Sequence, residues 1–253
     1  MNSAVDKIRI KNYNPKMSSA FLDFLFPPSC PVCGQSVSEH GQLCAACWNQ
    51  IDWISDPKCA KCGYPFPANL EYNGRTLCPN CIAKKTKLDW LRSACVYDEA
   101  SRNIILPFKH NARLQYQNAM SRAMFALLRE IPKRDLTVMP IPLAARRLWV
   151  RGYNQAALLA RPIAKHLGTK IDYDSVFRKH TPDMGHKNAA MRRQNIAGVF
   201  SIRRPDKIRG RAILLVDDVY TTGATMGELA RVLKKAGAAW VGAITFCRVV
   251  RAI

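Results

Sequence analysis

The apolar residues of this chain form two kinds of run, which alternate along its C-terminal two thirds. Short continuous runs rich in branched residues predict strands that are buried on both faces of a parallel sheet. These runs lie at 93–97, 136–142, 212–216 and 239–247. Runs with helical spacing lie at 104–108, 113–131, about 155–166 and 226–235. Strands that alternate with helices predict an α/β fold with a doubly wound parallel sheet.

An acidic pair and a hydroxyl-rich turn follow the predicted strand at 212–216. The pair is Asp217 and Asp218, and the turn consists of Thr221, Thr222, Gly223, Ala224 and Thr225. Ligands of open α/β sheets bind at the carboxyl ends of the strands, where these residues are expected to lie. Gly223 allows a close backbone approach or a positive φ, and Thr225 is the expected N-cap of the next helix.

This combination favours a phosphorylated sugar as the ligand. The N–H groups of a first helical turn and the helix dipole together stabilise an anion such as phosphate. Two carboxylates would repel that phosphate unless they bind something else, such as sugar hydroxyl groups or a Mg²⁺ ion shared with the ligand. The alternative is an ordinary strand–helix junction with acidic residues at the strand end and a threonine cap.

The chain is far more basic than solubility requires. Its 253 residues include 39 Lys and Arg against 18 Asp and Glu, which gives a net charge of +21. Two zinc sites of four thiolates each would lower the balance to about +17. An anionic partner is therefore expected, which could be nucleic acid, a nucleotide, polyphosphate or an acidic membrane surface.

Four Cys-x2-Cys pairs lie close together in the N-terminal third of the chain. They are Cys30 and Cys33, Cys44 and Cys47, Cys59 and Cys62, and Cys78 and Cys81. Two such turns complete a tetrahedral shell, so eight cysteines predict two closed, structural Zn²⁺ sites. Sequential pairing gives two zinc ribbons in tandem, and the spacing leaves a crossed pairing open. Cys95 and Cys247 lie in apolar runs and are expected to be buried, inert thiols.

Aromatic and basic residues are interleaved in this cysteine-rich region. They include Trp48 and Trp53 among the aromatic residues, and Lys58, Lys61, Lys84 and Lys85 among the basic ones. Such a mixture can bind single-stranded DNA, because bases stack on the rings while lysines pair with phosphates. The aromatic residues can equally form the small core of a zinc module.

The composition predicts three parts along the chain. These are a disordered tail at 1–14, a helix with the double zinc ribbon at 15–87, and the sheet domain at 88–253. The apolar helix expected at 15–26 either packs on the chain's own next domain or makes a protein or homo-oligomer contact. We find neither a membrane-spanning run nor a signal peptide, so a cytoplasmic protein is expected.

The acidic pair and the turn resemble the phosphoribosyl pyrophosphate (PRPP) motif of type I phosphoribosyltransferases. The matching residues, 214–225, read Leu-Leu-Val-Asp-Asp-Val-Tyr-Thr-Thr-Gly-Ala-Thr. The resemblance implies that Asp217 and Asp218 hold the ribose 2′ and 3′ hydroxyl groups, and that residues 221–225 hold the 5′-phosphate. It also implies that Mg²⁺ accompanies PRPP and that the fold is a type I phosphoribosyltransferase-like parallel sheet flanked by helices.

The whole pattern is similar to the ComF/GntX family of double-zinc-ribbon phosphoribosyltransferase-like proteins. The further features that carry this resemblance are the cysteine pairs, the string Pro140-Ile-Pro-Leu followed by Arg147, and the string Arg151-Gly-Tyr-Asn-Gln. Residues 140–147 match the family's pyrophosphate loop. The resemblance therefore implies a place near the diphosphate for Leu143, Arg146, Arg147 and Arg151, and a catalytic role for Arg146 beside the two aspartates.

Residues 177–195 match the family's flexible basic loop, which is thought to close over the site. Relatives usually show a glutamine a few residues past the threonine, where this chain has Pro-Asp-Met-Gly at 182–185, so that role is not carried over. Lys187, Arg192 and Arg193 remain candidates for contacting the diphosphate or a nucleic-acid backbone. A solvated loop that contacts neither is the alternative.

Two functions from different classes are consistent with the sequence. The first is transfer or sensing of a phosphoribosyl group, in which a nitrogen nucleophile displaces diphosphate at C1 through an oxocarbenium-like state. The second is implied by the resemblance to ComF, and it is the handling of single-stranded DNA during competence and DNA uptake, with the fold as a scaffold. The sequence identifies no residue that would recognise an acceptor base.

Overall fold

The computed structural model describes residues 26–83, 87–110, 115–179 and 197–250. Several expectations fall outside these ranges. They concern the tail at 1–14, all but the last residue of the helix at 15–26, and Lys84, Lys85, Lys187, Arg192 and Arg193.

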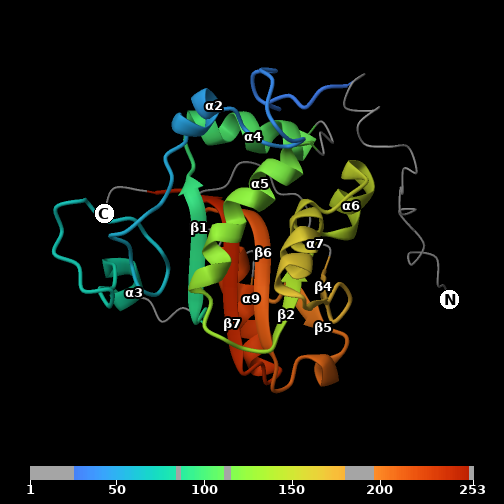
Figure 1. The fold of residues 1–253 in the computed structure, drawn as a ribbon. Helices are drawn as coiled ribbons and strands as arrows, with labels where there is room; N and C mark the ends of the chain where they lie inside the picture. Colours follow the sequence, from blue (N-terminus) through green and yellow to red (C-terminus); the bar gives the residue numbers. More distant parts are fainter. Residues whose placement is uncertain (1–25, 84–86, 111–114, 180–196, 251–253) are drawn as a thin grey trace.

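A five-stranded parallel sheet forms the centre of the protein (Figure 1). In spatial order its strands are β1 (Trp90–Val96), β7 (Trp240–Arg248), β6 (Ala212–Tyr220), β2 (Leu136–Pro140) and β3 (Lys170–Ile171). Every neighbouring pair is parallel, so the carboxyl ends of all strands meet at one edge. The apolar runs predicted four of these strands, and the parallel α/β fold is confirmed. The two-residue β3 is too short to produce a recognisable run.

Helices cover both faces of the sheet and form two hydrophobic cores (Figure 1). On one face lie α5 (Gln115–Phe125) and α7 (Gln155–Leu167), whose Met120 and Leu159 are fully buried. On the other face lies α9 (Ala224–Lys235), which buries Leu229 and Leu233. Because both faces are covered, β7 is buried at all nine of its positions.

Helix α4 (Glu99–His110) is longer than the short helix predicted at 104–108. The backbone N–H of Ser101 donates to Asp98 Oδ1 at 2.8 Å, and the N–H of Asp98 donates to Ser101 Oγ at 2.9 Å. This reciprocal cap satisfies two backbone donors and starts the helix before its apolar stretch. Figure 1 shows α4 lying across the end of the sheet at which β1 terminates. The helix therefore covers the edge on which the site was expected.

Three further predictions about the elements need correction. The single helix expected at 113–131 is α5 followed by the 3₁₀ helix η1 (Ala126–Glu130). The region after β2 contains an additional helix, α6 (Ala145–Arg151), which Gly152 ends with a φ of 72°. The beginning of the expected flexible loop is instead strand β4 (Val176–Arg178), which pairs antiparallel with β5 (Phe200–Ile202). A short 3₁₀ helix, η2 (Pro205–Lys207), follows β5.

The second cysteine-rich unit, which contains the cysteine pairs between Cys59 and Cys81, is fixed to the sheet domain by a cluster of charged side chains. Lys58 Nζ lies 3.1 Å from Glu130 Oε1, and Arg92 Nε lies 2.6 Å from Glu130 Oε2. Lys58 and Arg92 are both buried, and a buried cation requires such a partner. Lys58 was expected among the exposed bases of a DNA-binding surface. It is instead buried in an ion pair with Glu130.

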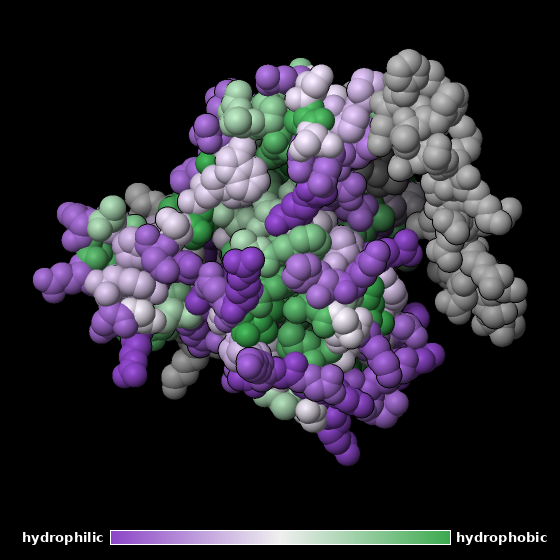
Figure 2. All heavy atoms as spheres, viewed as in Figure 1, coloured by the Kyte–Doolittle hydropathy of each residue, from purple (hydrophilic) through white to green (hydrophobic). Residues whose placement is uncertain are grey.

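The surface combines charged margins with a partly apolar centre. Figure 2 shows hydrophilic residues around the outline of the described chain and hydrophobic residues toward the middle of this face. Among the described residues, no helix is both long and apolar enough to cross a bilayer.

Candidate functional site

The acidic pair lies within β6 and not after it. The predicted strand ended at Val216, but the pairing with β7 continues to Tyr220 opposite Arg248. The neighbouring strand β2 ends at Pro140, opposite Val216. Asp217 and Asp218 therefore project beyond the end of β2, at the carboxyl edge, as the position of the motif predicted. Because successive side chains of a strand alternate, the two carboxylates leave β6 on opposite faces.

Asp218 is held in an ion pair beneath α4. Its Oδ2 lies 3.2 Å from the Nζ of Lys109, and only 9% of its side chain is exposed. A carboxylate that has lost so much water needs a nearby cation to remain charged. Lys109 provides that cation, although sequence analysis did not select it. The signal that could have identified Lys109 in the sequence is its position at the end of a predicted helix that follows the first strand of the sheet.

Burial and a neighbouring negative charge dominate the environment of Asp217. Burial and the negative charge of Asp218 raise its pKa to about 7, while the N–H of Asp218, Lys109 and Arg178 act to lower it. The N–H of Asp218 donates to Asp217 Oδ1 at 2.9 Å. Asp217 therefore gains and loses a proton near neutral pH.

The turn after β6 leads directly into α9. The N-cap residue is Gly223, with a φ of 73°, so the prediction of Thr225 as N-cap is wrong. The left-handed conformation favours glycine, and a Cβ added there would also collide with the hydroxyl of Tyr220. Thr222 Oγ1 accepts from the N–H of Ala224 at 3.4 Å. The turn thus brings the positive end of the α9 dipole to the edge that carries the acidic pair.

The predicted arginines lie on α6, which follows the carboxyl end of β2. Arg146 and Arg147 are exposed, Arg151 is partly buried at the last position of the helix, and Leu143 precedes the helix in the connecting loop. Of these arginines, Arg147 is close enough to Arg178 on β4 to lower the pKa of Arg178, although burial is the larger cause.

Arg178 is a second residue that sequence analysis did not select. Burial and Arg147 lower its pKa, whereas Asp217 raises it, so the charges of both the arginine helix and the acidic pair act on Arg178. Its guanidinium carbon stands 5.8 Å from the centre of the Phe200 ring. In the described part of the chain its buried Nε has no hydrogen-bond partner. The sequence assigned this segment to a basic loop, and only the β4–β5 pairing shows that Arg178 is fixed.

The Gly-Tyr-Asn-Gln string at 152–155 connects the arginine helix to α4. The hydroxyl of Tyr153 donates to the carbonyl of Phe108 at 2.6 Å, and Gln155 Nε2 donates to the carbonyl of Lys109 at 3.4 Å. Asn154 accepts from the N–H of Ala156 and so caps α7. These contacts fix the backbone from which Lys109 reaches Asp218.

The eight paired cysteines form two clusters, each made from two consecutive pairs. One contains Cys30, Cys33, Cys44 and Cys47, and the other contains Cys59, Cys62, Cys78 and Cys81. Within each cluster all sulfur atoms lie within 4.8 Å of one another. Tetrahedral zinc with Zn–S bonds of about 2.3 Å requires sulfur atoms roughly 3.8 Å apart. The separations of 3.5 Å between Cys33 and Cys44 and 3.6 Å between Cys62 and Cys78 fit that requirement, and the sequential pairing is confirmed.

Arg248 joins the second cysteine cluster to the strand that carries the acidic pair. It is buried at the end of β7 and donates to the carbonyl of Cys62. Its guanidinium also stacks on the rings of Tyr64 and Tyr220, at 5.2 and 5.4 Å from their centres. Tyr220 in turn lies against Gly223. The second zinc ribbon therefore supports one side of the turn that precedes α9.

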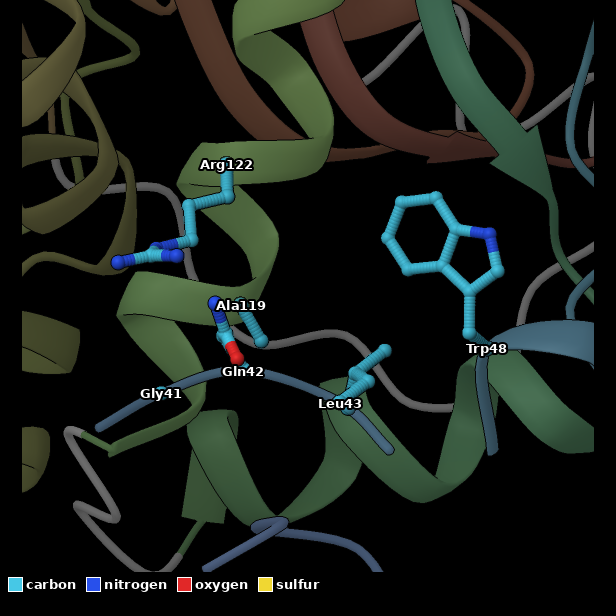
Figure 3. Close-up of a pocket in the computed structure, with 6 residues that line it drawn as sticks. All are labelled: Gly41, Gln42, Leu43, Trp48, Ala119 and Arg122. Atoms are coloured by element: carbon cyan, nitrogen blue, oxygen red, sulfur yellow. The ribbon is translucent and has the colours of Figure 1, made fainter. Parts of the chain in front are cut away.

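A pocket lies between the first zinc ribbon and α5 (Figure 3). Its volume is about 290 Å³, and it is lined by Gly41, Gln42, Leu43, Trp48, Ala119 and Arg122. Trp48 is 43% exposed and stands against Trp53, with ring centres 4.2 Å apart. Arg122 forms an ion pair with Glu39. This pocket combines a partly exposed aromatic ring with a cation.

Cys95 and Cys247 are opposite each other on β1 and β7, and both are fully buried. Burial is the largest cause that raises the pKa of each thiol. Both thiols therefore remain protonated, and the prediction that they are buried is confirmed.

Two family models match the chain. Residues 21–82 match the model described as a double zinc ribbon domain, and residues 154–251 match that of a phosphoribosyl transferase domain. Competence protein F of Haemophilus influenzae is 32% identical over 208 residues, which is 79% of this chain and 87% of the relative. The DNA utilization protein YhgH of Escherichia coli strain K12 is 29% identical over 231 residues, which is 88% of this chain and 97% of the relative.

The chain also resembles solved structures at lower identity. A glutamine phosphoribosylpyrophosphate amidotransferase from B. subtilis matches with 16% identity and a TM-score of 0.38, over 55% of this chain and 30% of that chain. A hypoxanthine phosphoribosyltransferase from Staphylococcus aureus matches with 17% identity and a TM-score of 0.33, over 51% of this chain and 60% of that chain. The chain spans less than two thirds of either structure.

The fold and the cysteine clusters define a double-zinc-ribbon protein with a phosphoribosyltransferase-like domain. The chain belongs to the ComF family, as its similarity to competence protein F shows. The family resemblance found in the sequence is therefore confirmed.

We expect the purified protein to bind two Zn²⁺ ions per chain, because each cysteine cluster offers four thiolates at suitable separations. Native mass spectrometry measures this number directly. Cys44→Ser and Cys78→Ser should each lower it to one. Cys95→Ala, which removes a thiol outside the clusters, serves as the control and should retain two. A single ion in the unsubstituted protein would contradict the assignment.

Proposed function

We propose that this protein binds PRPP at the carboxyl edge of the sheet and transfers, or responds to, its phosphoribosyl group. The observation that carries the proposal is the placement of Asp217 and Asp218 immediately before the glycine turn and the N-terminus of α9. In this assignment, residues 221–225 bind the 5′-phosphate with their N–H groups and hydroxyls. The acidic pair binds the sugar hydroxyl groups, because carboxylates accept strong hydrogen bonds from hydroxyl donors.

The arginines of α6 fit the opposite end of the ligand. As diphosphate leaves C1, negative charge develops on its oxygens and requires cations nearby. Arg146 and Arg147 supply positive charge on the same edge of the sheet, and Arg151 and Leu143 belong to the same segment. Arg178 adds a further cation, on which the charges of both Arg147 and Asp217 act. Lys187, Arg192 and Arg193, which lie outside the described residues, are further candidates for contacting the diphosphate.

Mg²⁺ enters this proposal as part of the substrate. A diphosphate binds the ion through its own oxygens, and Mg²⁺ usually keeps several waters and few protein ligands. The ion would offset the charge of the leaving diphosphate. The protein's own residues hold the two ends of the ligand and orient C1 toward a nucleophile.

We expect Asp217→Asn combined with Asp218→Asn to weaken Mg²⁺–PRPP binding at least ten-fold, because two charged acceptors are lost. A hydrogen bond to a charged group contributes about 1.5–3 kcal/mol. In the unsubstituted protein, affinity should rise between pH 6 and 8, because the pKa of Asp217 is about 7 and its ionised form accepts hydrogen bonds from hydroxyl groups more strongly than its protonated form. Isothermal titration calorimetry at several pH values measures both effects.

The matched control is Asp135→Asn, an acidic residue that is 89% exposed and pairs with Arg211. It should leave both the affinity and its pH dependence unchanged. PRPP itself also takes up protons near pH 6, so the pH dependence that remains in the double variant measures the contribution of the ligand. Equal affinities of the double variant and the unsubstituted protein would refute the assignment of the acidic pair.

A second proposed function is binding of single-stranded DNA at the first zinc ribbon. The names of the relatives refer to competence and DNA utilization, and this chain carries a net charge of +21. The observation in its favour is the pocket beside Trp48, whose lining includes this partly exposed ring and, on its other side, Arg122 (Figure 3). Bases can stack on the ring while the strand's phosphates meet the basic surface.

We expect Trp48→Ala to weaken single-stranded DNA binding by five-fold or more, since stacking contributes about 1–3 kcal/mol per base. Fluorescence anisotropy with a labelled oligonucleotide should also show an affinity that falls steeply with salt. Trp149→Ala is the control, because Trp149 is the most exposed tryptophan of the described chain and lies on α6. The pocket is ruled out as the stacking site if Trp48→Ala binds like the unsubstituted protein.

A further inference from the structure

Lys109 is separated in sequence from every segment that the motif and the phosphoribosyl transferase family model cover. It lies on α4, whereas that model begins at residue 154 and the acidic pair lies on β6. Yet its Nζ is 3.2 Å from Asp218 Oδ2, and 24% of its side chain is exposed. The side chain is thus largely covered, while its ammonium group contacts the acidic pair.

The backbone on which Lys109 stands is fixed by the segment that follows the arginine helix. Tyr153 and Gln155 donate to the carbonyls of Phe108 and Lys109, at 2.6 and 3.4 Å. A helix end held by two side-chain donors has little freedom to move its lysine away from Asp218. The arginine helix and the lysine are therefore connected through a few residues.

We propose that Lys109 is a member of the ligand site, where its ammonium group balances the charge of Asp218 beside the sugar of the ligand. This inference rests on the proposed binding of PRPP. The ligand carries several negative charges, and two uncompensated carboxylates at its sugar would repel it. Lys109 removes one of those charges from inside the site, so the sugar hydroxyls can approach the acidic pair.

The groups around the pair support this role of Lys109. The charge of Asp218 on the same strand raises the pKa of Asp217. The charges of Lys109 on α4 and Arg178 on β4 lower it. The charge of Arg147 on α6 in turn lowers the pKa of Arg178. On β7, burial is the largest cause that raises the pKa of the Cys247 thiol, so this thiol stays neutral. Asp218 also raises the pKa of Cys247, and Lys109 lowers it. Among these groups, Lys109 is the cation in direct contact with Asp218.

Lys109→Met keeps most of the side-chain volume and removes the charge. We expect it to weaken Mg²⁺–PRPP binding at least ten-fold at pH 7 by calorimetry. We also expect the midpoint of the pH-dependent rise in affinity to move upward by about one pH unit, because a neighbouring cation lowers a carboxyl pKa by roughly that much or more. Lys109→Arg should restore both within about three-fold. A purely structural role would not move the midpoint.

The control is Lys234→Met, which breaks a comparable ion pair with Asp89, 2.6 Å long, at the opposite edge of the sheet. It should leave the affinity and the midpoint unchanged. If Lys109→Met binds PRPP with the affinity and midpoint of the unsubstituted protein, the inference is wrong while the proposed function stands.

A second measurement needs no ligand and separates the two proposals. Nuclear magnetic resonance of protein labelled with ¹³C at the aspartate carboxyl carbons follows the titration of Asp217 and Asp218 directly. In Lys109→Met the titration of the pair should shift to higher pH, and in Lys234→Met it should not. If the unsubstituted protein binds no PRPP, the proposed function fails, and this titration still decides whether Lys109 controls the acidic pair. Unchanged titration in Lys109→Met would overturn the inference.

Discussion

The electrostatic balance of two adjacent carboxylates at the end of a buried strand governs the organisation of the candidate site. Asp217 and Asp218 follow a run of four buried apolar residues, so little water remains to stabilise their charges. The surrounding elements supply the compensation. Helix α4 places Lys109 on Asp218, and β4 places Arg178 near Asp217. A ligand that offers hydroxyl donors to the pair and anions to the nearby arginines would complete this balance.

The zinc ribbons contribute to the site through packing contacts. Closed four-thiolate shells leave no position for a substrate, so their role is to stabilise short segments that lack a core of their own. The second ribbon is anchored twice to the sheet domain. Glu130 binds the buried cations Lys58 and Arg92, and Arg248 connects Cys62 to Tyr220 beside the glycine turn. Loss of this ribbon would therefore expose the buried charges of Arg92 on β1 and of Arg248 on β7, the strand beside β6.

Sequence patterns predicted the parts of the fold whose signals are local. Apolar runs located four strands, paired cysteines located both metal clusters, and the motif at 214–225 located the turn before α9. The missing parts depend on contacts between distant segments. Lys109 and Asp218 are 109 positions apart in the chain, and Arg178 is fixed by pairing of β4 with β5. A lysine such as Lys58 is expected at the surface, and only the structure shows that it is buried in an ion pair with Glu130.

The proposed function depends on recognition of the hydroxyl groups of a phosphorylated pentose by the acidic pair. The most direct test compares ribose 5-phosphate with 2-deoxyribose 5-phosphate by calorimetry on the unsubstituted protein at pH 8, where Asp217 is mostly ionised. Both ligands present the same phosphate to the turn, so only the contact with one hydroxyl differs. The account predicts at least ten-fold weaker binding of the deoxy sugar, since a hydrogen bond to a charged group contributes about 1.5–3 kcal/mol. Equal binding of the two sugars would contradict it.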